Sequence, residues 1–444
     1  MAKIVIIGAG SGFGGRLSVD ILSREALQHS TICLCDIHPG RLKSVTDYVQ
    51  RTIDKYNLPT RLESSTDRRK VLAGADFVVT SISVGGGAYY GFPYNVEIEV
   101  PRKYGVDQAV GDTVGPGAVF RFLRTGPVQQ QILRDMEELC PNALVLNHTN
   151  PMCMLTWLHS VGTSIANVGL CHGVQATTRK MAKLLDVPYE ETNFLCAGIN
   201  HLAWVLDFHH GKEDLYPRLR ALIDQPDKIE GEEVRFEIFK HFGVFSTESN
   251  RHDSEYMPYF RRTEQLRGKF DLESREVGMT VPSKREWMTD SGDEEDQEPV
   301  GELKLSHEYS SGIMEAVVTN EPYRFNGNVM NHGLIGNLPQ GCCVEVPCMV
   351  DSQGVNPCHV PDLPAQLAAI DRTNINVQEL AVQAVLERDK EAAFHACCLD
   401  PLTASVLSLD NIRAMFEEMW EAEASLLKHF DPNHRGPLPE TCAE

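Results

Sequence analysis

The sequence has few positive charges and no long apolar run. Lysine and arginine total 41 against 62 aspartate and glutamate residues, so the formal net charge is −21. A surface of this sign repels phosphate backbones and anionic lipid. No stretch approaches the roughly 20 apolar residues that a membrane-spanning helix needs. We therefore expect neither nucleic acid nor a membrane surface as a partner.

The 13 cysteines also lack the pattern of a disulfide framework. Their number is odd, no C-x-x-C pair occurs, and two of the sites are doublets, at 342–343 and 397–398. The apolar run at residues 3–7 lacks the charged lead and the cleavage site of a signal peptide. We expect a protein of the reducing cytoplasm. A chain of 444 residues with 42% hydrophobic and 23% charged residues is typical of a folded protein with two or three domains.

The N-terminal residues follow the order of a dinucleotide-binding unit. A β-branched run at 3–7 precedes a glycine-rich loop at 8–15, and helical apolar spacing follows at 16–22. The pattern G-x-G-x-x-G fits from Gly10 to Gly15, although counting from Gly8 places Phe13 at the third glycine. A second strand, at 32–35, ends on Asp36. A carboxylate there accepts the ribose hydroxyls of NAD and repels the 2′-phosphate of NADP.

An ordinary tight turn followed by a surface aspartate would have the same residues. The order of strand, loop, helix and acid-terminated strand favours dinucleotide binding, with the pyrophosphate at the N-terminus of the helix. The predicted cofactor-binding residues are Gly8, Gly10, Ser11, Gly12, Phe13, Asp36 and Ser83.

Further apolar runs at 77–81, 143–147 and 165–170 are typical of strands buried in a parallel sheet. Ligands of such sheets gather beyond the carboxyl ends of the strands, which directs attention to residues 83–87, 147–151 and 171–174. We predict an α/β fold, with a Rossmann-like NAD-binding domain at 1–194 and an α+β substrate and metal domain at 195–444.

The second half is less regular. Runs at 193–197 and 203–208 predict strands around a turn at 198–201. Amphipathic spacing predicts helices near 209–241, 302–318, 362–393 and 409–429. Polar turns are expected at 326–328 and 337–341, where they either bind a sugar or are only turns.

Three places have the residue types of a reactive site. Cys171 and His201 each follow a predicted strand, and a thiolate with an imidazole suits a divalent transition metal, although a core cysteine and a turn histidine would look the same. Asp112 is either the N-cap of the next helix or a cleft carboxylate whose raised pKa makes it a general acid. Residues 243–256 are dense in titratable and hydroxyl groups, which suggests a ligand loop or a solvated turn.

Taken in order, these motifs resemble the family-4 glycoside hydrolases. The resemblance rests on the loop at 8–11, Asp36, and the segments 111–117, 150–151, 169–174, 197–201, 247–249 and 337–346. It is strongest to the melibiase-type α-galactosidases, with α-glucosidases, α-glucuronidases and α-galacturonidases close behind. It implies a fold like that of lactate and malate dehydrogenases, NAD⁺ and Mn²⁺ as cofactors, and a homodimer or homotetramer.

The resemblance also implies a mechanism, which differs from the usual scheme of two carboxylates. NAD⁺ oxidises C3 of the sugar, a base removes the C2 proton, the aglycone leaves by elimination, water adds, and the hydride returns. The expected substrate is an unphosphorylated α-hexoside, first of all an α-galactoside. A lactate- or malate-type dehydrogenase is the alternative from another class, which the Cys171 and His201 pair disfavours.

Residue roles follow from the same resemblance. Cys171 and His201 would hold the metal, Asp112 would protonate the leaving oxygen, and Asn150 would bind substrate hydroxyls. His172 stands where the 6-phosphoglycosidase branch has an acidic residue or asparagine, which disfavours a hexose 6-phosphate. For the C2 base, that branch has a tyrosine at the position of Ser249, and the neighbours able to replace it are Glu248, His252 and Tyr256.

Overall fold

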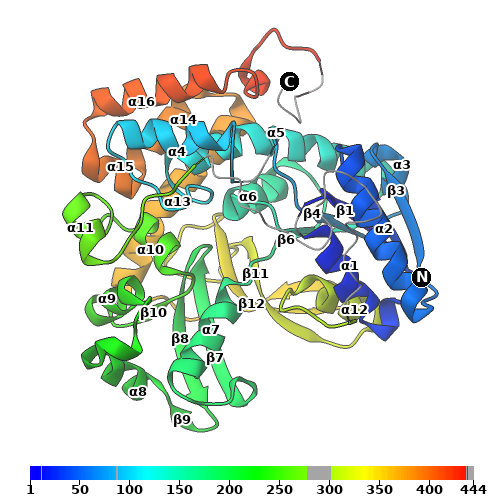
Figure 1. The fold of residues 1–444 in the computed structure, drawn as a ribbon, viewed down its shortest axis with the longest axis horizontal. Coiled ribbons are helices and arrows are strands. Elements are labelled where there is room, and N and C mark those ends of the chain that lie inside the picture. The colour runs from blue at the N-terminus through cyan, green and yellow to red at the C-terminus, as the bar shows by residue number, and fades with distance from the viewer. Residues whose placement is uncertain (12, 87–88, 278–301, 437, 439–444) are drawn as a thin grey trace.

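A computed structural model describes the chain except for residues 12, 87–88, 278–301, 437 and 439–444 (Figure 1). The strands are β1 (Lys3–Ile7), β2 (Thr31–Cys35), β3 (Arg61–Ser65), β4 (Phe77–Thr80), β5 (Leu144–Asn147), β6 (Asn167–Gly169), β7 (Thr192–Ile199), β8 (Leu202–His210), β9 (Glu213–Asp214), β10 (Phe245–Ser246), β11 (Tyr323–Met330), β12 (Cys343–Asp351) and β13 (Gly354–Pro357).

The helices are α1 (Gly14–Leu22), α2 (Pro39–Tyr56), α3 (Arg68–Leu72), α4 (Tyr94–Lys103), α5 (Gly115–Leu139), α6 (Met152–Gly162), α7 (Gly173–Leu184), α8 (Tyr216–Ala221), α9 (Glu233–Phe242), α10 (Asn250–Tyr256), α11 (Glu264–Lys269), α12 (Ser310–Thr319), α13 (Ala365–Glu387), α14 (Lys390–Leu399), α15 (Pro401–Val406) and α16 (Leu409–Ala422).

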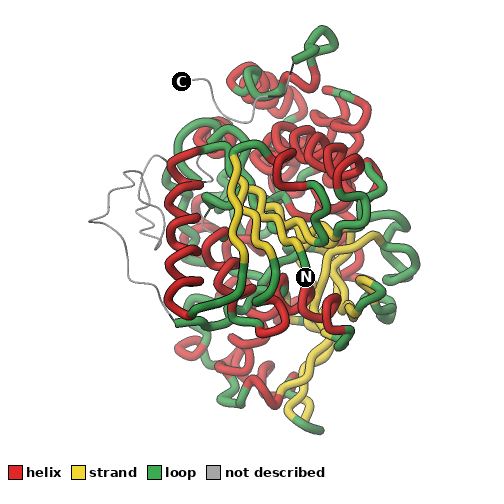
Figure 2. The backbone as a smooth tube through the Cα atoms, turned by 90° about the vertical axis from the view of Figure 1, so that its right-hand side faces the viewer, coloured by secondary structure: helices red, strands yellow, loops and turns green. Residues whose placement is uncertain are grey.

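The first six strands form a parallel sheet in the order β3-β2-β1-β4-β5-β6. This is the strand order of a dinucleotide-binding Rossmann fold. The inner strands β1 and β4 are almost wholly buried, because helices lie on both sides of the sheet (Figure 2). The predicted parallel α/β sheet is confirmed.

The two halves of the chain share one mixed sheet. Strand β11 pairs antiparallel with β6 through Asn328 and Gly169, and β12 pairs with β7 through Glu345 and Gly198. The order therefore continues from β6 through β11, β12, β7 and β8 to β10. This continuity places the ends of β6, β7 and β10 in one region. The domain boundary expected between residues 194 and 195 falls inside β7 and stays a prediction.

Several predicted elements differ from those observed. Residues 326–328, expected as a turn, lie within β11, where the amides of Asn326 and Asn328 donate to the backbone carbonyls of Cys196 and Gly169. The expected helix at 302–318 begins only at Ser310. The expected helix at 209–241 is broken into β9, α8 and α9, and that at 362–393 breaks at Arg388, whose φ is +58°. No helix among the described residues is long and apolar enough to cross a membrane.

Candidate active site

The glycine-rich loop between β1 and α1 is shaped for a close approach of backbone. Gly8 has a φ of +82°, and a Cβ added there would lie 2.1 Å from the carbonyl oxygen of Ser81. One oxygen of Asp36 accepts the backbone N–H of Gly10 at 2.8 Å, which fixes the loop against the end of β2. The hydroxyls of Ser11 and Ser81 lie 3.0 Å apart. The loop therefore meets the end of β4, where Ser83 is half-buried.

Two of the predicted cofactor residues need separate comment. The ring of Phe13, at the position of the expected third glycine, lies 5.5 Å from that of His148, which follows β5. Gly12 lies outside the described residues. The other predicted residues lie at the carboxyl ends of β1, β2 and β4, the edge at which Rossmann folds bind dinucleotides.

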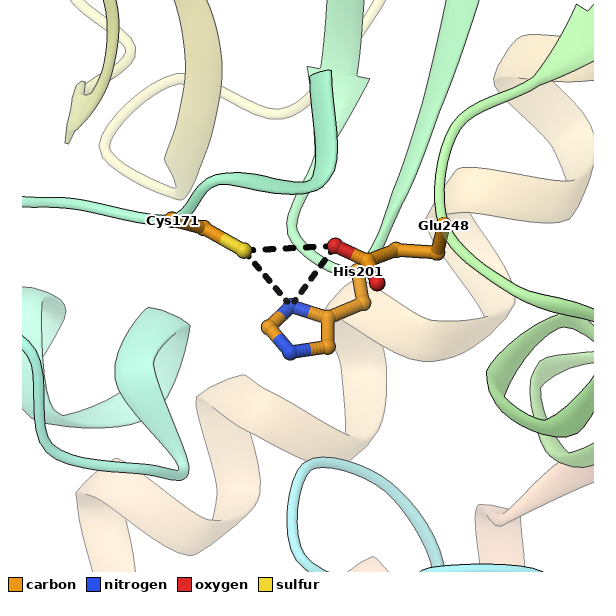
Figure 3. A group of neighbouring side chains, drawn as sticks. All are labelled: Cys171, His201 and Glu248. Carbon is orange, nitrogen blue, oxygen red and sulfur yellow. Dashed lines mark hydrogen bonds and ion pairs between the residues drawn. The ribbon is translucent and has the colours of Figure 1, made fainter. Parts of the chain in front are cut away.

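Three side chains from distant segments converge at the far end of the same edge (Figure 3). Cys171 follows β6, His201 lies in the turn between β7 and β8, and Glu248 follows β10. The Cys171 Sγ lies 4.0 Å from the His201 Nδ1 and 3.2 Å from the Glu248 Oε1, and the last two atoms are 3.9 Å apart. One ion bound about 2.0–2.5 Å from each atom would produce separations of this size.

Sulfur, imidazole nitrogen and carboxylate oxygen together suit a divalent transition metal. Burial lowers the pKa of His201 to about 4, although Glu248 opposes this, so the ring is neutral and able to ligate at pH 7. Burial and Glu248 raise the pKa of the Cys171 thiol. A bound cation would favour the thiolate that ligation requires. The residues thus fit a metal ion.

Hydrogen bonds to neighbouring residues hold His201 in place. Its backbone N–H donates to the Tyr256 hydroxyl at 3.0 Å, and its Nδ1 contacts the side-chain oxygen of Asn200. The Asn200 amide donates in turn to the buried Glu345 at 3.4 Å. Tyr256 is fully buried, and its hydroxyl also donates to the carbonyl of Asn200 at 3.4 Å. Tyr256 therefore supports the His201 turn from beneath.

Asp112 is buried and does not cap a helix, because α5 begins at Gly115 with Val114 as its N-cap. Its Oδ2 accepts hydrogen bonds from the Tyr89 hydroxyl and the Asn150 amide, both at 2.8 Å. Burial raises the pKa of Asp112, but the electrostatic influence of the neighbouring His252 and Arg121 side chains outweighs it, so the pKa lies below its usual range. The raised pKa expected for an acid is therefore wrong for the free protein.

The remaining predicted residues fall into different surroundings. His252 lies on α10 with its ring 4.7 Å from that of His201, and its buried Nδ1 makes no hydrogen bond with any described residue. Ser249 is exposed at the start of α10, outside this ring pair. His172 is largely exposed, and its Nδ1 lies 3.3 Å from the carboxylate of Glu308, a residue that no motif in the sequence indicates.

A cavity of about 800 Å³ opens beside Glu248 and His252. Its lining includes His172, Glu248 and His252 together with polar residues of α7 and α9. The structure thus brings Asp112, Asn150, Cys171, His201 and His252 into one region, with Glu248 and Tyr89 added. Tyr89 precedes α4 in a segment without an apolar period, so the sequence offered no signal for it.

The fold and this region define a class: a Rossmann-type protein with a candidate divalent-metal centre at the edge of its sheet. Comparison with known families identifies it further. The model of the family 4 glycosyl hydrolases matches residues 3–187, and that of the family 4 glycosyl hydrolase C-terminal domain matches residues 196–403. The chain belongs to glycosyl hydrolase family 4, as the motifs predicted.

Named relatives agree with this assignment. An α-galactosidase of Bacillus subtilis is 39% identical over 97% of this chain and 100% of its own length. An α-galactosidase of Rhizobium meliloti is 35% identical over 96% of this chain and 89% of its own length. Relatives named α-glucosidase and α-galacturonidase are 30% and 28% identical.

Solved structures confirm the fold. A 6-phospho-α-glucosidase from gut microorganisms, in complex with NAD and Mn²⁺, aligns with a TM-score of 0.77 and 18% identity over 99% of each chain. A second such enzyme, in complex with NAD and glucose 6-phosphate, aligns with a TM-score of 0.79 and 21% identity over 96% of this chain and 99% of that chain. A malate dehydrogenase from Plasmodium falciparum aligns with a TM-score of 0.52 and 14% identity over 89% of this chain and 100% of that chain, which confirms the dehydrogenase-like architecture.

Proposed function

We propose that the chain is an NAD- and Mn²⁺-dependent glycosidase that hydrolyses unphosphorylated α-hexosides, with α-galactosides as its first substrates. The observation that carries the proposal is the identity of 39% and 35%, over nearly the whole chain, to two relatives named α-galactosidase. The relatives named α-glucosidase and α-galacturonidase make glucosides and galacturonides the alternatives to test.

Residues suited to both cofactors support this proposal. The loop at 8–13 with Asp36 and Ser83 would hold NAD, and Cys171 with His201 would hold the metal. When bound, NAD⁺ supplies reversible oxidation at C3 of the sugar, and Mn²⁺ supplies Lewis-acid polarisation of the sugar oxygen. Residues 1–194 would form the cofactor domain and 195–444 the substrate and metal domain, in a homodimer or homotetramer of the cytoplasm.

Asp112 and Asn150 would bind the sugar next to the metal. The Asn150 amide already donates to the Asp112 Oδ2, so the pair presents a fixed set of polar atoms. The Asp112 Oδ1 is buried and makes no hydrogen bond with any described residue. In the free protein this oxygen belongs to a carboxylate, which suits it to accept a sugar hydroxyl. To act as the acid to the leaving oxygen, Asp112 must gain a proton on that atom after the sugar binds.

His252 is the residue that we propose as the C2 base. Like Ser249, it lines the cavity. Its ring, however, lies 4.7 Å from that of His201, and its buried Nδ1 makes no hydrogen bond among the described residues. Tyr256, by contrast, already bonds to the backbone of the His201 turn, and Ser249 is exposed. Geometry therefore favours the imidazole over the two hydroxyls for removing a carbon-bound proton.

The surroundings of His172 support the choice of an unphosphorylated sugar. Its ring nitrogen Nδ1 lies 3.3 Å from the Glu308 Oε1, and the other oxygen of this carboxylate, Oε2, lies 3.7 Å from the Nδ1 of His148. A phosphate placed here would have to compete with this carboxylate for the same histidines. The charge already present thus disfavours a hexose 6-phosphate.

A panel of nitrophenyl glycosides tests the proposal. The enzyme would be assayed on α-galactoside, α-glucoside, α-galacturonide and α-galactoside 6-phosphate, with and without NAD⁺, Mn²⁺ and a thiol reductant. We expect hydrolysis of the α-galactoside to exceed that of the others and to require both cofactors. Hydrolysis that is indifferent to NAD⁺ would contradict the mechanism, and a preference for the glucoside or galacturonide would reassign the sugar.

A further inference from the structure

Glu248 has a backbone conformation that a residue with a side chain seldom adopts. Its φ is +77°, in the left-handed region that favours glycine. Such conformations persist only where the surrounding structure holds them, and they gather at functional sites. We therefore expect contacts with neighbouring residues to hold the Glu248 backbone in this conformation.

Both backbone groups of Glu248 are fixed. Its N–H donates to the Thr177 hydroxyl at 3.0 Å, and its carbonyl accepts from the Arg235 guanidinium at 2.6 Å. Arg235 is itself buried and bonded to Glu232 at 2.6 Å. Thus α7 and α9 together hold the residue in its left-handed conformation, and this conformation turns the carboxylate toward Cys171 and His201 (Figure 3).

The space that the carboxylate occupies exists because residue 173 is glycine. A Cβ added at Gly173 would lie 1.7 Å from the Glu248 Oε1, which is far inside van der Waals contact. Gly173 begins α7 and is not among the glycines with a positive φ, so its backbone does not itself require glycine. The absence of a side chain at Gly173 therefore leaves room for the Glu248 carboxylate.

From this geometry we propose that Glu248 is the third protein ligand of the metal ion and that Gly173 keeps its coordinating position open. The inference rests on the metal dependence of the proposed function. It gives the ion a sulfur, a nitrogen and an oxygen ligand before any sugar binds, and carboxylate oxygen is a ligand that Mn²⁺ prefers. It also removes Glu248 from the candidates for the C2 base.

The test is Mn²⁺ binding by the full-length protein, stripped with chelator and free of NAD⁺ and sugar. Free Mn²⁺ would be measured by electron paramagnetic resonance during titration. We expect Glu248→Ala to raise the Kd for Mn²⁺ at least tenfold, and Glu248→Gln to raise it by a smaller factor because the amide oxygen can still ligate. Gly173→Ala should weaken binding as well, although it removes no donor atom.

Two comparisons make the test specific. Gly268→Ala is the matched control, because Gly268 also lies in a helix and a Cβ there meets no atom within 4 Å, so it should leave the Kd unchanged. In the double variant, Gly173→Ala should add little to Glu248→Ala, since both act through one carboxylate. Melting temperatures of each metal-free variant verify that the protein is folded.

Opposite outcomes are equally clear. If wild-type protein binds Mn²⁺ and Glu248→Ala binds it equally well while losing solvent exchange of the substrate C2 hydrogen, Glu248 is a base and the inference is overturned. If Gly173→Ala weakens binding as strongly in the Glu248→Ala background, the role of Gly173 is wrong. Failure of the sugar-free wild-type protein to bind Mn²⁺ would also overturn the inference of a three-ligand site. The metal dependence on which the inference rests is tested separately, by the requirement for Mn²⁺ in the glycoside panel.

Discussion

At the scale of single residues, α7 and β7 lie between Cys171 and His201 in the sequence, yet the ligand atoms of these two side chains are 4.0 Å apart. Desolvation opposes the charged form of each group, raising the pKa of Cys171 and lowering that of His201. Both shifts favour neutral groups in the metal-free protein. A cation that requires thiolate would therefore bind with release of a proton, and more tightly as pH rises.

Replacing either of these two residues should abolish hydrolysis while sparing the cofactor loop. We expect Cys171→Ser and His201→Ala to lose at least a thousandfold in kcat, because each removes a metal ligand. NAD⁺ binding, followed by quenching of protein fluorescence, should change less than threefold, since Gly10 and Asp36 lie at other strand ends. Metal-dependent turnover retained by both variants would show that the metal is bound elsewhere.

His252 carries a separate expectation. His252→Gln keeps a polar side chain of similar size but cannot take a proton from carbon, so kcat should fall by roughly 10²–10⁴. Mn²⁺ affinity should stay within threefold of wild type, because His252 supplies none of the three proposed ligand atoms. Loss of Mn²⁺ affinity in step with activity would mean that the residue acts on the metal instead.

The sequence indicated much of the site, because residues that follow strands meet at one edge of a sheet. Cys171 and His201 were found in this way, and Asp112 from its glycine-flanked position. The partners of Asp112 could not be predicted: Tyr89 lies in a segment without periodicity, and the depressed pKa depends on His252 and Arg121. Glu248 was considered only as a base, since nothing in its local sequence reveals a left-handed backbone.

At the scale of elements, polar residues in strands account for the main errors. Strand β3 was missed because its sequence, RLESS, is mostly exposed at the edge of the sheet. The turn predicted at 326–328 is wrong: Asn326 and Asn328 suggest a turn, but both lie within β11, where they are buried and donate hydrogen bonds to neighbouring strands. The apolar strands β1, β2, β4 and β5 were predicted to within one residue at either end.

Helix α6 carries a buried histidine that makes acid pH destabilising. Neither ring nitrogen of His159 makes a hydrogen bond with the described residues, and burial lowers the pKa of His159 to about 3. The unfolded chain, with a pKa near 6.5, binds the proton more readily, so this histidine costs stability as pH falls from about 6.5 toward 3. At pH 5 the cost is about 2 kcal/mol.

His159→Met should remove this cost. Between pH 7 and pH 5 the variant should lose about 2 kcal/mol less unfolding free energy than wild type, measured by urea denaturation of the metal-free protein. The exposed His332 offers a matched control, and His332→Met should leave the pH dependence as it is in wild type. Equal pH dependence in the His159 variant and wild type would refute the prediction.

At the scale of the whole molecule, one sheet joins the strands of the predicted NAD site to the strands that precede Cys171, His201 and Glu248. Glu345 in β12 faces Gly198 in β7, and Asn328 in β11 faces Gly169 in β6, so the substrate half is built directly onto the edge of the nucleotide half. The general fold could be predicted from the apolar strands β1, β2, β4, β5 and β6. This junction could not, because pairing between strands so distant in sequence leaves no local pattern.

The central claim is that this dehydrogenase-like architecture performs hydrolysis through transient oxidation of the sugar. Hydrolysis of a nitrophenyl α-galactoside in D₂O, with the released sugar examined by nuclear magnetic resonance, tests it most directly. The account predicts deuterium at C2 of the product, formed only when NAD⁺ and Mn²⁺ are both present. Product released at full rate with hydrogen retained at C2 would contradict it.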